Sequence, residues 1–190
     1  MDTFQNKKKK IGAQHLLNPQ PAVLVGTYYD GKPNFITISC AGITSAEPPT
    51  IYIAINHIRY SLKAIQEHKT FSVNVPSASL VKETDYCGQV SGADHDKAKE
   101  CDFEIFNGTL KNAPLIGQCP INFECEVIQQ ISVGEQTVII GKILESYLSE
   151  DCYTDGLPDL RKINPLSYCS ATAGTGGYFN LGELAGKPGD

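Results

Sequence analysis

The chain lacks several features that would identify its class at once. No apolar run approaches the ~18 residues needed to cross a bilayer, and no apolar segment follows the N-terminal lysines, so we expect neither a membrane span nor a signal peptide. The net charge of −5 gives no electrostatic case for a nucleic-acid partner. The seven cysteines include no Cys-x-x-Cys pair, so we interpret them as reduced thiols of a cytoplasmic protein, most of them small core residues.

Motifs for catalysis and for metal binding are missing as well. The sequence has no Gly-x-Ser-x-Gly elbow and no His-x-x-x-His spacing, so a hydrolase or a metal site has little support. The run Ala173-Gly174-Thr175-Gly176-Gly177 follows no clear strand and begins no convincing helix. We therefore interpret it as a flexible loop, the alternative being a dinucleotide-binding loop.

What the chain does contain is the composition of an ordinary globular protein. Its 190 residues are 41% hydrophobic and 19% charged, which favours one domain over residues 1–190. We expect a polar tail over residues 1–14 and a loop-rich segment over 150–190, where glycines and prolines gather. No internal repeat or linker divides the chain.

The predicted elements are mostly strands that follow one another in hairpins. Apolar and alternating runs predict strands at 22–25, 34–40, 51–55, 71–75, 121–131 and 136–148, and short helices at 61–68, 77–87 and 96–100. Asp30-Gly31, between the first two strands, is typical of a hairpin turn, and we expect Gly88 to close the second helix. Strands without long helices between them indicate a mainly β fold, an antiparallel barrel with helices packed outside.

The stretch from Asn34 to Cys40 is the first candidate for a binding site. Period-two alternation places Phe35, Thr37 and Ser39 on one face, and Asn34, Ile36, Ile38 and Cys40 on the other. Two hydroxyls and an amide are unusual for a plain core strand. The pattern therefore predicts that a polar ligand meets the sheet here.

The second candidate is an anion site at the start of the helix predicted over 61–68. We expect Ser61 to be its N-cap, with Arg59 two residues earlier. Exposed helix N–H groups, a hydroxyl and a guanidinium would bind a phosphate; the alternative is a capped helix with a surface arginine. Lys97 is either a second positive charge at this site or a surface lysine. Together with the hydroxyl-bearing strand, these features fit a phosphorylated aromatic cofactor.

An ordered set of motifs over residues 15–185 carries a resemblance to a known family. The motifs are Pro21-Ala22-Val23-Leu24-Val25-Gly26-Thr27, Asp30-Gly31-Lys32-Pro33-Asn34 with Thr37 and Ser39, Glu47-Pro48-Pro49, Arg59-Tyr60-Ser61, Phe71-Ser72-Val73-Asn74-Val75, Cys87-Gly88 to Ser91-Gly92 with Asp96-Lys97, Phe123-Glu124-Cys125, and Tyr178-Phe179-Asn180-Leu181-Gly182-Glu183. The chain resembles the flavin reductase-like family with an FMN-binding split barrel, and most of all its flavoredoxin-like branch.

This resemblance implies a fold, a cofactor and an activity. The fold is an antiparallel split barrel of Greek-key type, with FMN held noncovalently between the two subunits of a homodimer. The activity is that of a flavin reductase-type oxidoreductase, which passes electrons from NADH or NADPH through FMN to a small-molecule or protein acceptor. The cofactor does the chemistry, so no catalytic side chain is needed. The alternative is a carrier or sensor that binds FMN without turnover.

The resemblance also implies which residues contact the cofactor. These are Asn34, Ile36, Thr37, Ile38, Ser39, Cys40, Ala54, Ile55, Asn56, Arg59, Ser61, Lys97 and Tyr178. Among them, Asn34, Thr37 and Ser39 would contact the ring edge or the ribityl chain. Arg59, Ser61 and Lys97 would hold the phosphate, and Tyr178 or Tyr168 would cover the site from the tail.

The chain departs from the flavoredoxin-like pattern at Cys40. Many members of the branch carry tryptophan there, whereas this sequence contains no tryptophan. A wall contact against the flavin is then lost or replaced by a small thiol. Cys40 is either a small buried core residue or a thiol that faces the flavin.

Overall fold

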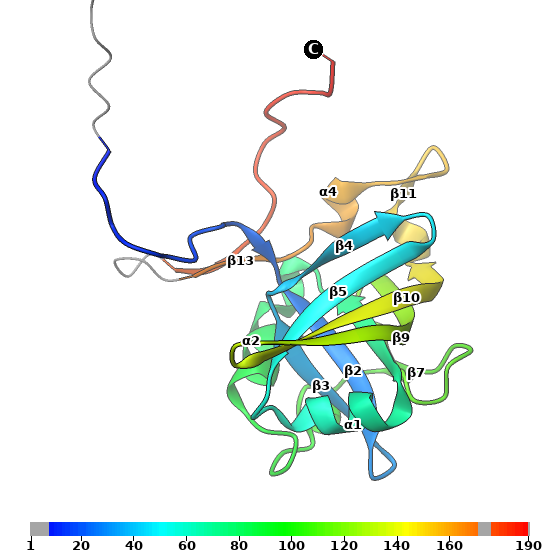
Figure 1. Cartoon of the computed structure of the whole chain (residues 1–190). Coiled ribbons are helices and arrows are strands. Elements are labelled where there is room, and N and C mark those ends of the chain that lie inside the picture. Colours follow the sequence, from blue (N-terminus) through cyan, green and yellow to red (C-terminus); the bar gives the residue numbers. More distant parts are fainter. Residues whose placement is uncertain (1–7, 171–175, 190) are drawn as a thin grey trace, which may run out of the picture.

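The computed structural model describes residues 8–170 and 176–189 (Figure 1). Its main feature is a seven-stranded antiparallel sheet in the strand order β3-β2-β6-β9-β10-β5-β4. The strands are β2 (Val23–Tyr29), β3 (Lys32–Ile38), β4 (Ala41–Ala46), β5 (Pro49–Asn56), β6 (Thr70–Val75), β9 (Ile121–Val133) and β10 (Gln136–Leu148). The chain leaves β5 and returns through β6 and β9 to β10, which pairs with β5. This connection is a Greek key, and the predicted antiparallel barrel is confirmed.

Helices and short strands surround the barrel. The helices are α1 (Tyr60–His68), α2 (Val81–Gln89), α3 (Lys97–Glu100) and α4 (Leu160–Ile163), with 3-10 turns η1 (Ala78–Leu80) and η2 (Glu150–Cys152). The short strands are β1 (Gln20–Pro21), β7 (Ile105–Phe106), β8 (Leu115–Ile116), β11 (Tyr153–Thr154), β12 (Leu157–Pro158), β13 (Ser167–Cys169) and β14 (Gly177–Phe179). Figure 1 shows α1 across one end of the barrel and α2 on its side. Within the described residues, no helix is long and apolar enough to span a membrane.

The predicted hairpins are confirmed, and their turns follow from the sequence. Asp30 and Gly31 both have positive φ angles, 49° and 75°, which a two-residue turn needs to match the twist of its strands. The β9–β10 hairpin turns at Gly134, whose φ is 57°. Strand β4 was not predicted, because its glycine and hydroxyl residues give it little apolar alternation; it pairs with β5.

Strand β3 is buried on both faces, and its predicted alternation is confirmed. Ile36 and Ile38 pack inside the barrel, while Phe35 packs outside it, against residues of the helical side. The strand ends at Ile38, however, so Ser39 and Cys40 lie in the bend before β4. Four of the seven cysteines (Cys87, Cys119, Cys125 and Cys152) are buried, as expected for core residues.

Helix α2 differs from its prediction at both ends. The 3-10 turn η1 precedes it, and the helix continues through Gly88 to Gln89. Gly88 does not end the helix because it serves the packing of α2 on β3: a Cβ at this position would lie 3.3 Å from the Cβ of Thr37. The glycine run predicted as a loop lies mostly in 171–175, outside the described residues, as does much of the tail predicted over 1–14.

A buried asparagine joins four parts of the barrel. The Asn74 amide nitrogen donates to the Leu24 carbonyl and to Ser72 Oγ, each at 3.0 Å. Its oxygen accepts from the Ile116 N–H at 2.9 Å and from Asn122 Nδ2 at 2.8 Å. The side chain is completely buried, so every one of these bonds replaces a lost contact with water.

We expect Asn74→Ala to lower the free energy of unfolding by about 3 kcal/mol, because buried partners on β2 and β8 would be left without hydrogen bonds. Denaturant titration measures this change. Asn180→Ala, at an exposed position, is the control and should change it by less than about 0.5 kcal/mol. A loss for Asn74→Ala no larger than the control's would show that the network does not stabilise the fold.

Candidate functional site

Two pockets flank the C-terminal end of α2, and the predicted site residues are divided between them. The Arg59 pocket, of about 100 Å³, is lined by Ile36, Ile58, Arg59, Tyr60, Ser61, Val90, Ser91, Gly92 and Lys97. The Tyr178 pocket, of about 230 Å³, is lined by Ala22, Thr37, Ser39, Asp85, Gly88, Gln89, Tyr168 and Tyr178. The chain from Gly88 to Gly92 borders both pockets.

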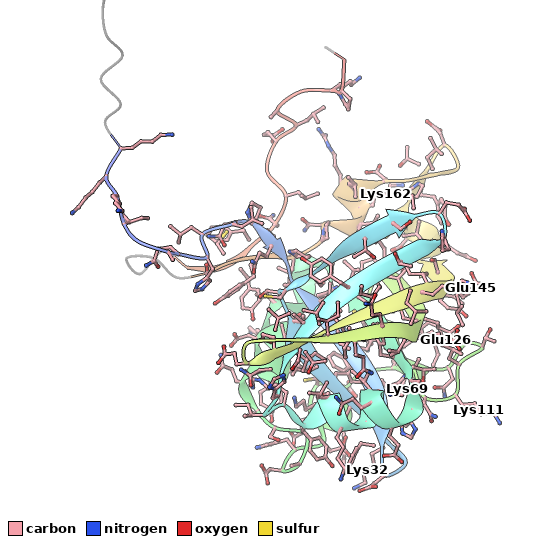
Figure 2. All side chains as sticks on the ribbon, in the orientation of Figure 1. Lys32, Lys69, Lys111, Glu126, Glu145 and Lys162 are labelled. Carbon is pink, nitrogen blue, oxygen red and sulfur yellow. The ribbon has the colours of Figure 1, made fainter. Side chains whose placement is uncertain are left out.

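Lys97 is a buried cation at the start of α3. It is only 3% exposed, whereas the lysines and glutamates labelled in Figure 2 project from the surface. Its Nζ donates to the Phe35 carbonyl at 2.9 Å and to the Cys87 carbonyl at 2.8 Å. Burial lowers the pKa of Lys97, because removing the ammonium from water penalises its charged form. An ammonium carries three N–H donors, so one remains for a ligand.

Ser61 is not the N-cap that the sequence predicts. Helix α1 begins at Tyr60, Arg59 is its cap residue, and no side chain caps it. Ser61 lies in the first turn, 2% exposed, and its Oγ accepts a hydrogen bond from Asn34 Nδ2 at 2.7 Å. A partner from β3 has therefore replaced the local capping bond.

The Arg59 pocket contains two cations, Arg59 and Lys97. The charge of Arg59 acts on Lys97 and contributes to lowering its pKa, so the two cations lie within electrostatic reach of one another. Among residues 8–170 and 176–189, neither cation forms an ion pair with a carboxylate. Two cations and a buried hydroxyl around one small pocket favour an anionic ligand.

The Tyr178 pocket combines two hydroxyl residues of the β3 end with two tyrosines. Thr37 Oγ1 donates to the Thr84 carbonyl of α2, so this hydroxyl already serves the packing of the helix. The rings of Tyr168 and Tyr178 lie 5.4 Å apart. Burial, together with the charge and hydrogen bond of Asp85, raises the pKa of Tyr178 to about 12.

The remaining predicted residues lie on β3, β5 and the bends that follow. Ile36, Ile38 and Ile55 point into the core, so Ile38 and Ile55 could reach a ligand only through their backbones. Ala54, on the outer face of β5, donates its N–H to the Cys40 carbonyl at 2.8 Å, and Asn56 Oδ1 accepts from the Ile58 N–H at 3.1 Å. Cys40 is exposed. The expectation of a buried core residue there is wrong, because β3 ends two residues earlier.

Nine residues that line the two pockets were not predicted as site residues: Ile58, Tyr60, Val90, Ser91, Gly92, Ala22, Asp85, Gly88 and Gln89. Ser91 and Gly92 line the Arg59 pocket, and Asp85 lines the Tyr178 pocket. Ser91-Gly92 stood among the motifs, but nothing in a single sequence shows that this loop faces α1. The partnership of Asp85 with Tyr178 joins distant segments and has no local signal.

Comparison with known proteins identifies the family of this chain. A family model described as a flavin reductase like domain matches residues 16–173. The chain belongs to this family. Within it, the structure of flavoredoxin from Methanosarcina acetivorans is similar at 35% identity, with a TM-score of 0.88, over 96% of this chain and 95% of that one.

Further structures agree with membership of the flavin reductase-like family. Flavoredoxin of Desulfovibrio vulgaris (Miyazaki F) is 33% identical, with a TM-score of 0.87, over 95% of this chain and 97% of that one. A flavin reductase with a split barrel domain from Shewanella frigidimarina has a TM-score of 0.79 at 18% identity, over 91% of this chain and 87% of that one. At that identity the likeness concerns the fold alone, and the fold of this chain is the split barrel.

We expect inorganic phosphate to stabilise this flavin reductase-like protein through the Arg59 pocket. At about tenfold its dissociation constant, a bound anion adds about 1.4 kcal/mol, which raises the thermal midpoint by about 4 °C. Arg59→Ala should lose this gain. Lys63→Ala, which removes an exposed lysine of α1 outside the pocket, should keep it. Chloride at the same ionic strength serves as the reference. If phosphate raised the thermal midpoint of Arg59→Ala as much as that of the parent, phosphate would not bind in the Arg59 pocket.

The same gain should depend on pH through Lys97. An anion binds the protonated ammonium, so the gain is present at neutral pH and shrinks as the pH rises through the Lys97 pKa. Because burial places that pKa below its ordinary value, the decline should begin earlier than for an exposed lysine. Thermal melts from about pH 8 to about pH 10 measure it. In Lys97→Met, phosphate should raise the thermal midpoint by less, and this rise should not decline with pH. If the pH dependence in Lys97→Met equalled that of the parent, Lys97 would not bind the anion.

Proposed function

We propose that the protein binds FMN noncovalently and that the Arg59 pocket holds the phosphate of the cofactor. The observation that carries this proposal is that Arg59 and buried Lys97 line the same pocket, and that neither forms an ion pair with a carboxylate among the described residues. The pocket fits a phosphate group chemically, since Arg59, Lys97 and the Ser61 hydroxyl can all donate and a phosphate can only accept. Gly92 adds room, because a Cβ there would collide with Asn34 Oδ1.

The flavin ring would then lie beside the bend that follows β3. In this arrangement Ser39 and Cys40 contribute from the bend, while Ala54 and Asn56 contribute from β5. Asn34, in contrast, is engaged with Ser61, so we assign it to the phosphate end instead of the ring edge. Tyr178, in the neighbouring pocket, covers the ribityl or ring side of the site.

FMN, when bound, supplies electron transfer from NADH or NADPH to a small-molecule or protein acceptor. The chain's own residues then bind, orient and shield. Arg59 and Lys97 fix the phosphate by charge. Backbone N–H groups from Thr37 to Cys40 would offer hydrogen bonds to the ring, and such donors stabilise negative charge. No titratable side chain of the chain is needed as an acid or base.

We further propose that a second copy of the chain completes the site. The outer face of the β9–β10 hairpin exposes Ile128, Ile131 and Val133, and Ile58, beside the Arg59 pocket, is 86% exposed. Exposed aliphatic residues grouped on one side of a protein typically mark an interface. Paired about a two-fold axis, two such faces would cover each other and enclose the exposed bend at Cys40.

Reconstitution with FMN followed by anaerobic titration tests the function. We expect the loaded protein to be yellow and to bleach on addition of NADH or NADPH, followed at the flavin absorbance. The double variant Arg59→Ala/Lys97→Met should retain little FMN, while Lys63→Ala should bind and bleach like the parent. A yellow protein that neither nucleotide bleaches would favour a carrier or sensor. A protein that cannot be loaded would overturn FMN binding altogether.

Sedimentation velocity tests the dimer. We expect the parent to sediment as a dimer and Ile131→Glu to sediment as a monomer with weakened FMN binding, because a charge on the aliphatic face opposes its burial. Leu157→Glu, on the exposed β11–β12 hairpin, is the matched control and should remain dimeric. A parent protein that is monomeric while it binds FMN tightly would contradict the shared site.

A further inference from the structure

Asn34 and Ser61 form a buried pair between β3 and α1. Asn34 is 6% exposed and Ser61 is 2% exposed. The Asn34 Nδ2 donates to Ser61 Oγ at 2.7 Å, across 27 residues of sequence. Asn34 therefore contacts α1, and Ser61, but not Asn34, is among the residues that line the Arg59 pocket.

This bond determines what the Ser61 hydroxyl can still do. A hydroxyl has one hydrogen and two lone pairs, and here a lone pair is taken by the Asn34 amide. Within residues 8–170 and 176–189, no acceptor takes the Ser61 hydrogen. The hydrogen is thus available to a ligand in the Arg59 pocket, and the ligand must be an acceptor.

The backbone of Gly92 lies close to the Asn34 amide. The Asn34 Oδ1 is buried and has no hydrogen-bond partner among the described residues. A Cβ on Gly92 would lie 2.0 Å from this oxygen and 2.7 Å from the amide carbon. Only glycine at position 92 therefore leaves room for the amide in its present place.

We propose that Asn34 is a positioning residue, which directs the Ser61 hydrogen toward an anion and so makes the site prefer a phosphorylated flavin over an unphosphorylated one. This inference rests on the proposed FMN binding. It differs from a direct contact with the flavin ring, because Asn34 acts through Ser61 and only on the phosphate end of the ligand.

A double-mutant cycle with two ligands tests the inference. The dissociation constants of FMN and of riboflavin, which lacks the phosphate, are measured by fluorescence for the parent, Asn34→Leu, Ser61→Ala and the double variant. We expect Asn34→Leu to weaken FMN about tenfold, as one hydrogen bond to a charged group would, and to leave riboflavin unchanged. In the Ser61→Ala background, Asn34→Leu should cause no further loss, because residues that act through one another are not additive.

Gly92→Ala gives a second route if Asn34→Leu folds poorly. The added methyl group should displace the Asn34 amide and weaken FMN relative to riboflavin. Gly182→Ala, where a Cβ meets nothing within 4 Å, is the control and should change neither constant.

Three results would overturn the positioning role. Equal losses of FMN and riboflavin in Asn34→Leu would indicate a direct contact with the ring or ribityl chain. Additive losses in the double variant would show that Asn34 does not act through Ser61. If the parent bound FMN no better than riboflavin, the preference for the phosphorylated flavin would be wrong, although the proposal of FMN binding would remain. A parent that binds neither flavin would instead overturn the proposed function, and the inference with it.

Discussion

The buried ammonium of Lys97 is the interaction on which both the fold around the site and the site itself depend. It joins α3 to the carbonyl of Phe35 on β3, 62 residues away, and to that of Cys87 on α2. Removing an ammonium from water costs several kcal/mol unless charges or dipoles compensate for it. Two carbonyls provide part of this compensation and bring three elements together. No carboxylate of the described chain provides the rest, so the proposed anion in the pocket would stabilise the same contact that holds the helices against the sheet.

The division of the site into two pockets follows from how α2 lies on β3. Gly88 lets the helix approach Thr37 closely, and the Thr37 hydroxyl bonds to the Thr84 carbonyl. The end of α2 therefore crosses the sheet between the two pockets. Cations line the pocket on one side of this crossing, and tyrosines line the other. The end of α2 thus separates a pocket with two cations from a pocket with two tyrosines.

Much of the fold could be predicted from the sequence, because strand alternation and the Asp30-Gly31 turn are local signals with strict geometry. The two faces of β3 were predicted correctly for the same reason. The convergence of Arg59, Ser61 and Lys97 was a hypothesis from residue chemistry and resemblance, and the structure does bring these three side chains to one pocket. Predictions failed where a distant partner replaced a local one. Ser61 is a residue type that often caps helices, but its partner is Asn34. The prediction for Cys40 failed for another reason, because β3 ends earlier than its alternation suggests.

The two ends of the proposed cofactor site differ in how much of the binding energy they can supply. The phosphate end combines the exposed Arg59 with Ser61 and Lys97, which are buried and held by hydrogen bonds. These two buried groups lose little conformational entropy when a ligand arrives there. The proposed ring end is an exposed bend that carries a small thiol at Cys40 and has the tyrosines of the Tyr178 pocket beside it. A flavin bound by one chain would therefore be fixed by its phosphate and loosely packed at its ring. Burial of the ring then requires surface from outside the chain, and the exposed aliphatic face of the β9–β10 hairpin is where a second copy can provide it.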